Sequence, residues 1–291
     1  MQDNPHQISP RSLDLDEQIV DGRRIIANVP YLLPKDLGEV NRLDFQHYML
    51  RYAMRGNHLA PLQQPQSILD VACGTGRWAQ EMAAEFPQAQ ICGLDLQIPG
   101  QDARRKVTFP ANCSFVQANV MEGLPFPSSS FDYVHQRLLT VALPASAWPM
   151  LLRELVRVTK PGGWIELVEV DLEMLPAGPA MMQLYQWALQ ACARRGIDPT
   201  ISRNLVGLLT QAGAHSCQGR VIDIPVGKWG GRLGQMNLTD MNAIAGAMRS
   251  FIAQLANISP EDYDEATARS QQEYEQMHAK VNFYAILGQR P

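Results

Sequence analysis

A continuous apolar segment that ends in a glycine-rich turn is the feature that most limits how this chain folds. Residues 67–73 (SILDVAC) have the length and composition of a buried strand, and residues 76–87 (GRWAQEMAAEFP) have the pattern of a helix that ends before a proline. Gly74 and Gly76 stand between them, where glycine accepts positive φ angles and leaves room for a ligand close to the main chain. The stretch therefore predicts a buried strand, a turn able to receive a ligand, and a helix.

The same order of strand and helix continues along the chain. Further strands are expected at residues 89–96, 113–120, 131–139 and 164–172. A helix is expected at residues 148–163, where a Pro-Gly-Gly sequence stops it. Strands that alternate with helices form a parallel sheet with helices on both faces. The sequence therefore predicts an α/β fold.

The rest of the chain divides into a tail, a cap and a lid. Residues 1–18 are polar and aperiodic, which predicts a flexible tail. Residues 19–64 form an N-terminal cap segment with an amphipathic helix from Leu37 to about Arg55. Residues 65–291 form the main domain.

Within this domain, the last third is expected to cover a binding pocket. Helices are expected at residues 181–195, 201–213, 238–256 and 261–279, and closing strands at residues 216–229 and 281–291. A long excursion between strands needs something to pack on. We therefore expect lid elements at about residues 172–200 and 228–280.

Composition argues against several classes of function. The chain has 291 residues and a formal net charge of −4, and its densest basic run, Arg104-Arg105-Lys106, is too short for a nucleic-acid surface. The five cysteines form no Cys-x-x-Cys pair and no His, Asp and Glu set has ligand spacing, so no metal site is expected. The sequence has neither a signal-peptide pattern nor an apolar stretch of about 20 residues, which predicts a cytoplasmic protein without a membrane partner.

The residues around the turn narrow the class of ligand. Asp95 ends the second strand nineteen residues after Gly76, a spacing that suits a carboxylate accepting hydrogen bonds from ribose hydroxyls, although a helix N-cap is the alternative role. With Ala79 the turn also fits Gly-x-Gly-x-x-Ala, so an NAD site stays open. Asp70 places a negative charge beside the turn, which disfavours a pyrophosphate, and no Gly-Lys-Ser/Thr sequence follows.

Four motifs occur in a fixed order between about residues 66 and 171. They are LDVACGTGRWAQEMA, GLDL, ANVMEGLPFPSSSFDYVH and LVRVTKPGGWIELVEV. In order and spacing they resemble the class I S-adenosylmethionine-dependent methyltransferases, and the later FYAILGQRP segment also fits. The resemblance implies a Rossmann-like sheet that is mostly parallel with an antiparallel last strand. It also implies S-adenosyl-L-methionine as cofactor and S-adenosylhomocysteine as product.

The resemblance also implies a set of cofactor contacts. In that family the glycine turn contacts the methionine part, the acid after the second strand binds ribose, and residues after the third strand bind adenine. The positions that match are Asp70, Gly74, Gly76, Asp95, Leu96, Asn119 and Val120. The family often has aspartate where Asn119 stands, but an amide oxygen still accepts a hydrogen bond from the adenine amino group.

The segment before the first strand carries a second resemblance. Its sequence, DGRRIIANVPYLLPKDLGEVNRLDFQHYMLRYAMRGNHLAP, together with the His135-Gln136-Arg137 sequence after the fourth strand, resembles the LaeA-like methyltransferases of fungal secondary metabolism. This implies a natural-product tailoring enzyme, although the namesake acts as a regulator whose substrate is obscure. The resemblance further assigns cofactor contacts to Tyr31, Arg42, Gln46, His135 and Gln136.

Three residues are candidates for a general base. Transfer of a methyl group from a sulfonium is an in-line displacement, so the protein mainly aligns donor and acceptor, and a base helps when the acceptor is a hydroxyl or an activated carbon. The candidates are His47, His135 and Glu169, expected near the carboxyl edge of the sheet. Each has a structural alternative: a packed polar residue for His47, a loop contact for His135, and a partner of a helix N-terminus or of Arg42 for Glu169.

Soft and aromatic side chains are concentrated in the expected lid. They are Met174, Met181, Met182, Tyr185, Trp187, Trp229 and Met236. As a group such side chains suit an apolar, adaptable pocket, although for any single one of them a core position is the favoured interpretation. We therefore predict methyl transfer to oxygen, carbon or nitrogen of a small, largely apolar or aromatic metabolite, by a monomer or homodimer. A cofactor-binding regulator with little turnover, a dinucleotide oxidoreductase and a methyltransferase fold recruited for cyclisation or rearrangement stay open as alternatives.

Overall fold

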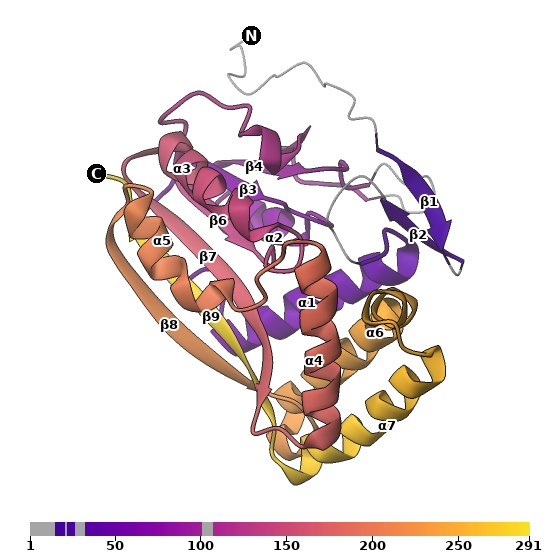
Figure 1. Ribbon diagram of the computed structural model, residues 1–291. Coiled ribbons are helices and arrows are strands. Elements are labelled where there is room, and N and C mark those ends of the chain that lie inside the picture. The colour runs from indigo at the N-terminus through magenta and orange to yellow at the C-terminus, as the bar shows by residue number, and fades with distance from the viewer. Residues whose placement is uncertain (1–14, 21, 27–32, 101–106) are drawn as a thin grey trace.

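A seven-stranded sheet forms the centre of the computed structural model, which describes residues 15–20, 22–26, 33–100 and 107–291 (Figure 1). Across the sheet the strands are β5 Cys113–Gln117, β4 Gln90–Asp95, β3 Ser67–Val71, β6 Phe131–Arg137, β7 Thr159–Leu175, β9 Lys280–Gln289 and β8 His215–Pro225. β3, β4, β5, β6 and β7 pair in parallel, whereas β9 pairs antiparallel with both β7 and β8. The predicted sheet, mostly parallel with an antiparallel last strand, is confirmed.

Helices cover both faces of the sheet. α3 Trp148–Val158 and α5 Leu205–Gln211 share one apolar cluster with Leu69 and Val71 of β3. α2 Arg77–Glu85 packs on the opposite face, in a cluster with Ile68 and Tyr133. Because neighbouring residues of a strand point to opposite faces, β3 supplies both clusters and is buried along its whole length.

The remaining helices gather at one end of the sheet. They are α1 Leu37–Met54, α4 Pro179–Arg194, α6 Gly231–Ala256 and α7 Pro260–Gln276. α4, α6 and α7 pack against one another, and α6 also packs against α1 (Figure 1). The cap helix and the lid helices therefore form one layer.

Several element ends differ from those predicted. α3 ends at Val158 rather than Gly163, because Pro161 disfavours helix before it, and β7 already begins at Thr159. α6 begins at Gly231, seven residues before the predicted start. A hairpin of β1 Glu17–Val20 and β2 Arg23–Ile26 precedes α1 and was not predicted.

Candidate active site

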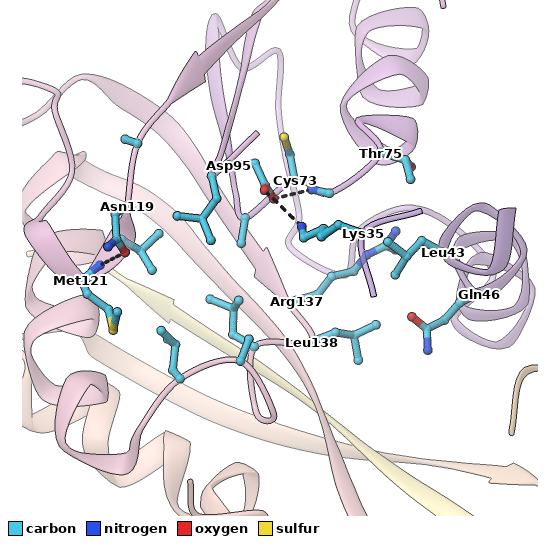
Figure 2. A pocket seen from close by; sticks show the side chains of 18 residues that line it. Lys35, Leu43, Gln46, Cys73, Thr75, Asp95, Asn119, Met121, Arg137 and Leu138 are labelled. Atoms are coloured by element: carbon cyan, nitrogen blue, oxygen red, sulfur yellow. Dashed lines mark hydrogen bonds and ion pairs between the residues drawn. The ribbon is translucent and has the colours of Figure 1, made fainter. Parts of the chain in front are cut away.

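A pocket lies at the carboxyl ends of β3, β4 and β6, beside the glycine turn (Figure 2). We call it the turn pocket, and its walls come from residues 72–75, 95–96, 118–121, 137–139 and 142–143, with Lys35, Leu43 and Gln46 from the cap. Asn119 and Met121 lie at one end of it and Leu43 and Gln46 at the other (Figure 2). This edge of a parallel sheet is where ligands bind in open α/β folds.

The two glycines of the turn have different tasks. Gly74 has a φ of +56°, and a Cβ there would meet only Leu43, at 3.9 Å. Gly76 has a φ of +73°, and a Cβ there would come within 2.9 Å of the Phe115 ring. Gly74 therefore leaves space above the turn open for a ligand, whereas Gly76 lets the start of α2 pack closely on an aromatic side chain. Gly76 does not line the turn pocket.

Asp95 ends β4 inside the turn pocket. Its Oδ2 accepts a hydrogen bond from Gly74 N at 2.8 Å, and its Oδ1 lies 3.7 Å from Lys35 Nζ. Figure 2 shows the Lys35 side chain reaching across the pocket to this carboxylate. A carboxylate has about four acceptor positions, so Asp95 keeps the capacity to accept hydrogen bonds from ribose hydroxyls.

The end of the turn pocket at Asn119 and Met121 is mostly apolar. Leu96, Val120 and Met121 line it together with Asn119. Asn119 caps the short 3-10 helix Val120–Glu122, and its Oδ1 accepts a hydrogen bond from Met121 N at 3.1 Å. Apolar walls beside an amide suit a planar base.

Arg137 lines the turn pocket and was not among the residues assigned from the sequence. It is the last residue of β6, and its Nη2 lies 2.9 Å from His47 Nδ1. Within the described part of the chain, the guanidinium makes no hydrogen bond other than this one. Burial lowers its pKa from the ordinary value. An arginine at the end of a buried strand is the signal by which the sequence could have revealed it, because a charge is rarely placed there without a partner.

His135 and Asp70 lie next to each other but outside the turn pocket. Asp70 Oδ1 lies 2.9 Å from His135 Nδ1, and the imidazole stacks on Trp78 with ring centroids 3.9 Å apart. His135 is 1% exposed and Asp70 3%. Both side chains face α2, so the pair joins β3 and β6 to that helix.

Glu169 and Gln136 also lie outside the pocket. Both oxygens of Glu169 accept hydrogen bonds, from Leu139 N at 2.8 Å, from Thr140 N at 2.8 Å and from Thr140 Oγ1 at 2.6 Å. Gln136 Nε2 donates to the same carboxyl group. Burial raises the pKa of Glu169, while these donors oppose the rise. The carboxyl group therefore holds the segment after β6, which forms part of the pocket wall.

His47 is enclosed between α1, α2 and β6. It is 1% exposed, and its Nε2 lies 3.0 Å from Glu81 Oε2. Burial, with the charge of Arg137, lowers the pKa of His47 to about 4. The imidazole is therefore neutral at pH 7 and accepts a hydrogen bond from Arg137.

Arg42 and Gln46 connect the cap helix to the lid. The Arg42 guanidinium donates to Asp240 Oδ1 of α6 at 2.8 Å and to both oxygens of Glu39, at 2.6 and 2.8 Å. Gln46 Nε2 donates to Asp240 Oδ2 at 2.8 Å. Gln46 lines the turn pocket, whereas Arg42 does not. Tyr31, the other predicted cap contact, lies outside the described residues.

A second pocket lies between β7, α1, α4 and α6, and we call it the lid pocket. Its space, open solvent included, is about 1480 Å³. Five methionines line it: Met174, Met181, Met182, Met241 and Met248. Of the side chains predicted for the cover, Met174, Met181, Met182 and Tyr185 line this pocket, and Trp187, Trp229 and Met236 do not. Leu43, Gln46 and Leu138 line both pockets, which therefore share a wall.

The described residues contain neither a cluster of metal-binding side chains nor a helix suited to span a membrane. No group of three or more His, Cys, Asp or Glu side chains there is arranged to hold a metal ion. In the same part of the chain, every helix is too short or too polar to cross a bilayer.

Comparison with known proteins agrees with the fold. Residues 68–163 match a family model described as a methyltransferase domain. Methyltransferase str3 of Strobilurus tenacellus is 33% identical over 196 residues, which cover 65% of this chain and 68% of that protein. The secondary metabolism regulator LAE1 of Cochliobolus heterostrophus is 32% identical over 213 residues, which cover 68% of this chain and 67% of that one.

Among solved structures, one similar fold is phosphoethanolamine N-methyltransferase 2 of Haemonchus contortus in complex with S-adenosyl-L-methionine. Its TM-score is 0.51 at 17% identity, over 85% of this chain and 57% of that one, so this likeness concerns the fold alone. The sequence relatives and the family model carry the assignment. This chain belongs to the class I S-adenosylmethionine-dependent methyltransferases.

Proposed function

We propose that this methyltransferase acts on a small, largely apolar or aromatic metabolite that binds in the lid pocket. The observation that carries the proposal is the shared wall: Leu43, Gln46 and Leu138 line both pockets, so a molecule in one lies beside a molecule in the other. Methyl transfer needs donor and acceptor in line and in contact. The kinship with LAE1, which is named a secondary metabolism regulator, supports a place in secondary metabolism.

The residues of the turn pocket fit the cofactor. Asp95 has acceptor positions left for the ribose, and Leu96, Asn119 and Val120 offer an apolar, amide-bearing surface to adenine. Arg137 supplies a cation for the carboxylate of the methionine end, since only one hydrogen bond to a described residue engages its guanidinium. When bound, the cofactor supplies a methyl group already activated by the sulfonium.

The chain's own part in the reaction is mainly positioning. Glu169 fixes the segment after β6, and the Arg42–Asp240 contact holds the cap helix against the lid. Leu43 and Leu138 make the junction of the pockets apolar, which keeps water away from the reacting groups. The assignment of a base to His47, His135 or Glu169 stays a prediction, and their enclosure favours positioning roles for all three.

A tryptophan placed in the lid pocket tests this function. Ala245 of α6 lines the pocket, so Ala245→Trp fills it, whereas Ala243→Trp adds the same group to the exposed side of the same helix. Each variant is incubated with S-adenosylmethionine and metabolite extract, and products heavier by one CH₂ are measured by mass spectrometry. We expect Ala245→Trp to lose at least tenfold in product while its affinity for S-adenosylhomocysteine stays unchanged.

The same experiment separates the alternatives. LAE1 is named a regulator, which keeps open a cofactor-binding protein with little turnover. Tight binding of S-adenosylhomocysteine without any methylated product would favour that alternative. A product formed without added mass would favour cyclisation or rearrangement, and equal turnover of both tryptophan variants would remove the lid pocket from the reaction.

A further inference from the structure

The polar groups in the wall of the lid pocket are few, and most already have partners. The Arg42 guanidinium donates to Glu39 and to Asp240, so its charge is matched by two carboxylates. The Tyr263 hydroxyl donates to Ala245 O at 3.1 Å, and the Tyr274 hydroxyl is hydrogen-bonded to a serine hydroxyl at 3.3 Å. These groups are therefore hydrogen-bonded within the protein and are not directed at a ligand.

Three polar groups of the wall keep unused capacity. Gln46 Nε2 faces the carboxylate of Asp240, which fixes the amide orientation and leaves Gln46 Oε1 as an acceptor at the junction of the two pockets. Glu173 uses Oε2 on Arg203. Within the described part of the chain, Gln46 Oε1, Glu173 Oε1 and the Tyr185 hydroxyl have no hydrogen-bond partner.

The charge of the wall is negative. Asp171 and Glu173 of β7 share the single guanidinium of Arg203, at 2.5 Å each, and Arg203 itself does not line the pocket. On the other side, Arg42 is shared by Glu39 and Asp240. Burial raises the pKa of Tyr185, and the charges of Glu173 and Asp171 raise it further, so their field reaches the pocket.

From this wall we infer that the methyl acceptor enters as a neutral or cationic molecule bearing hydroxyl or amino groups, and that carboxylate acceptors are rejected. The inference rests on the proposed function, because it takes the lid pocket as the acceptor site. Unused acceptors at Gln46 and Glu173 require donors on the ligand, and an anion would meet net negative charge without a spare cation. Glu173 and Tyr185 therefore determine specificity.

Three compounds with one carbon skeleton test the inference: 4-butylbenzylamine, 4-butylbenzyl alcohol and 4-butylbenzoate. Their dissociation constants are measured by titration calorimetry at pH 7.5 with the protein saturated in S-adenosylhomocysteine. We expect the amine and the alcohol to bind at least tenfold more tightly than the benzoate. The preference for the amine should shrink at higher salt, because the Glu173 side chain is 25% exposed and its charge is screened.

Two variants locate the preference. Glu173→Gln removes the charge, and we expect the ratio of benzoate to amine dissociation constants to fall at least threefold, while S-adenosylhomocysteine affinity is unchanged. Tyr185→Phe should weaken the binding of the alcohol at least threefold. This second variant keeps the inference testable if Glu173→Gln disturbs Arg203. Glu265→Gln, on an exposed face of α7, should change neither ratio.

The outcomes separate a failure of this inference from a failure of the proposed function. Equal affinity for all three compounds, or ratios unmoved by both variants, would overturn the inference while leaving the lid pocket as the acceptor site. If Ala245→Trp abolishes the binding of none of the three compounds, the inference and the proposed function fail together.

Discussion

At the scale of the residue, Arg137 lines the turn pocket, and we proposed above that it supplies the cation for the carboxylate of the cofactor's methionine part. We predict that Arg137→Met weakens S-adenosylhomocysteine binding at least tenfold, because the ligand's carboxylate loses its cation. The same change should leave 5′-methylthioadenosine, which has no amino-acid part, within twofold of its original affinity. Calorimetry measures both, and Arg194→Met on the exposed face of α4 is the control. Equal losses for the two ligands would mean a general disturbance of the pocket.

His47 makes a second prediction, on pH and stability. Its pKa is lowered to about 4 from 6.5 by burial and by Arg137. Between these two pH values His47 is therefore protonated in the unfolded chain and neutral in the folded chain. The neutral His47 therefore contributes to the free energy of unfolding above pH 6.5, and this contribution is lost as the pH falls towards 4. At 1.36 kcal/mol per pKa unit, the loss amounts to roughly 3 kcal/mol. Urea unfolding of His47→Gln between pH 4 and 7 should show a correspondingly smaller loss than the unaltered protein. Parallel curves for the two proteins would contradict this account.

Part of the site could be predicted from the sequence, and strand geometry explains the remainder. Gln46, Gly74, Asp95, Leu96, Asn119 and Val120 all line the turn pocket. Asp70 and His135 were assigned to the same edge of the sheet, but their side chains face α2, and a motif does not tell which face of a buried strand a residue occupies. Arg137 was missed because its partner, His47, is ninety residues away in the sequence.

At the scale of the element, helix α1 supplies two of the three residues that line both pockets. Leu43 and Gln46 lie on it, and Arg42 ties it to α6 through Asp240, which is fully buried. We predict that Asp240→Asn costs about 1–3 kcal/mol of unfolding free energy, because an amide NH₂ then faces the donors of Arg42 and Gln46. Denaturant titration measures the loss, and Asp223→Asn, which is exposed and lies 3.9 Å from Lys280 Nζ, should stay within about 0.5 kcal/mol of the unaltered protein. A similar loss at both positions would argue against a buried link.

The order and type of the elements followed from the sequence better than their ends did. The run 67–73 and the four later apolar runs each became a strand of the sheet, because a buried strand needs apolar residues on both faces. The β1–β2 hairpin was missed since each strand has only four residues, two polar followed by two apolar, which is too short to show an alternating pattern. The early start of α6 was missed because Gly231 and Gly234 read as loop residues, although Gly234 lies tightly against Gly227 O.

At the scale of the whole molecule, we expect ligand binding in the turn pocket to raise the free energy of unfolding. A ligand that binds only the folded chain stabilises it by about 2.7 kcal/mol at one hundred times its dissociation constant. We therefore expect S-adenosylhomocysteine to raise the melting temperature by several degrees and NAD to leave it unchanged. Asp95→Ala should abolish the rise, since the ribose loses its acceptor. A rise with NAD instead would require a different ligand for the turn pocket.

The pairing of β8 with β9 has a consequence for how such a molecule diversifies. Residues 226–279, which carry α6 and α7, leave the sheet at β8 and return to it at the neighbouring strand. An insert whose two ends are fixed side by side can be exchanged for another of different shape without moving the strands that carry the glycine turn. On the proposed function, exchange of residues 226–279 would change the acceptor site and leave the strands beside the turn pocket in place.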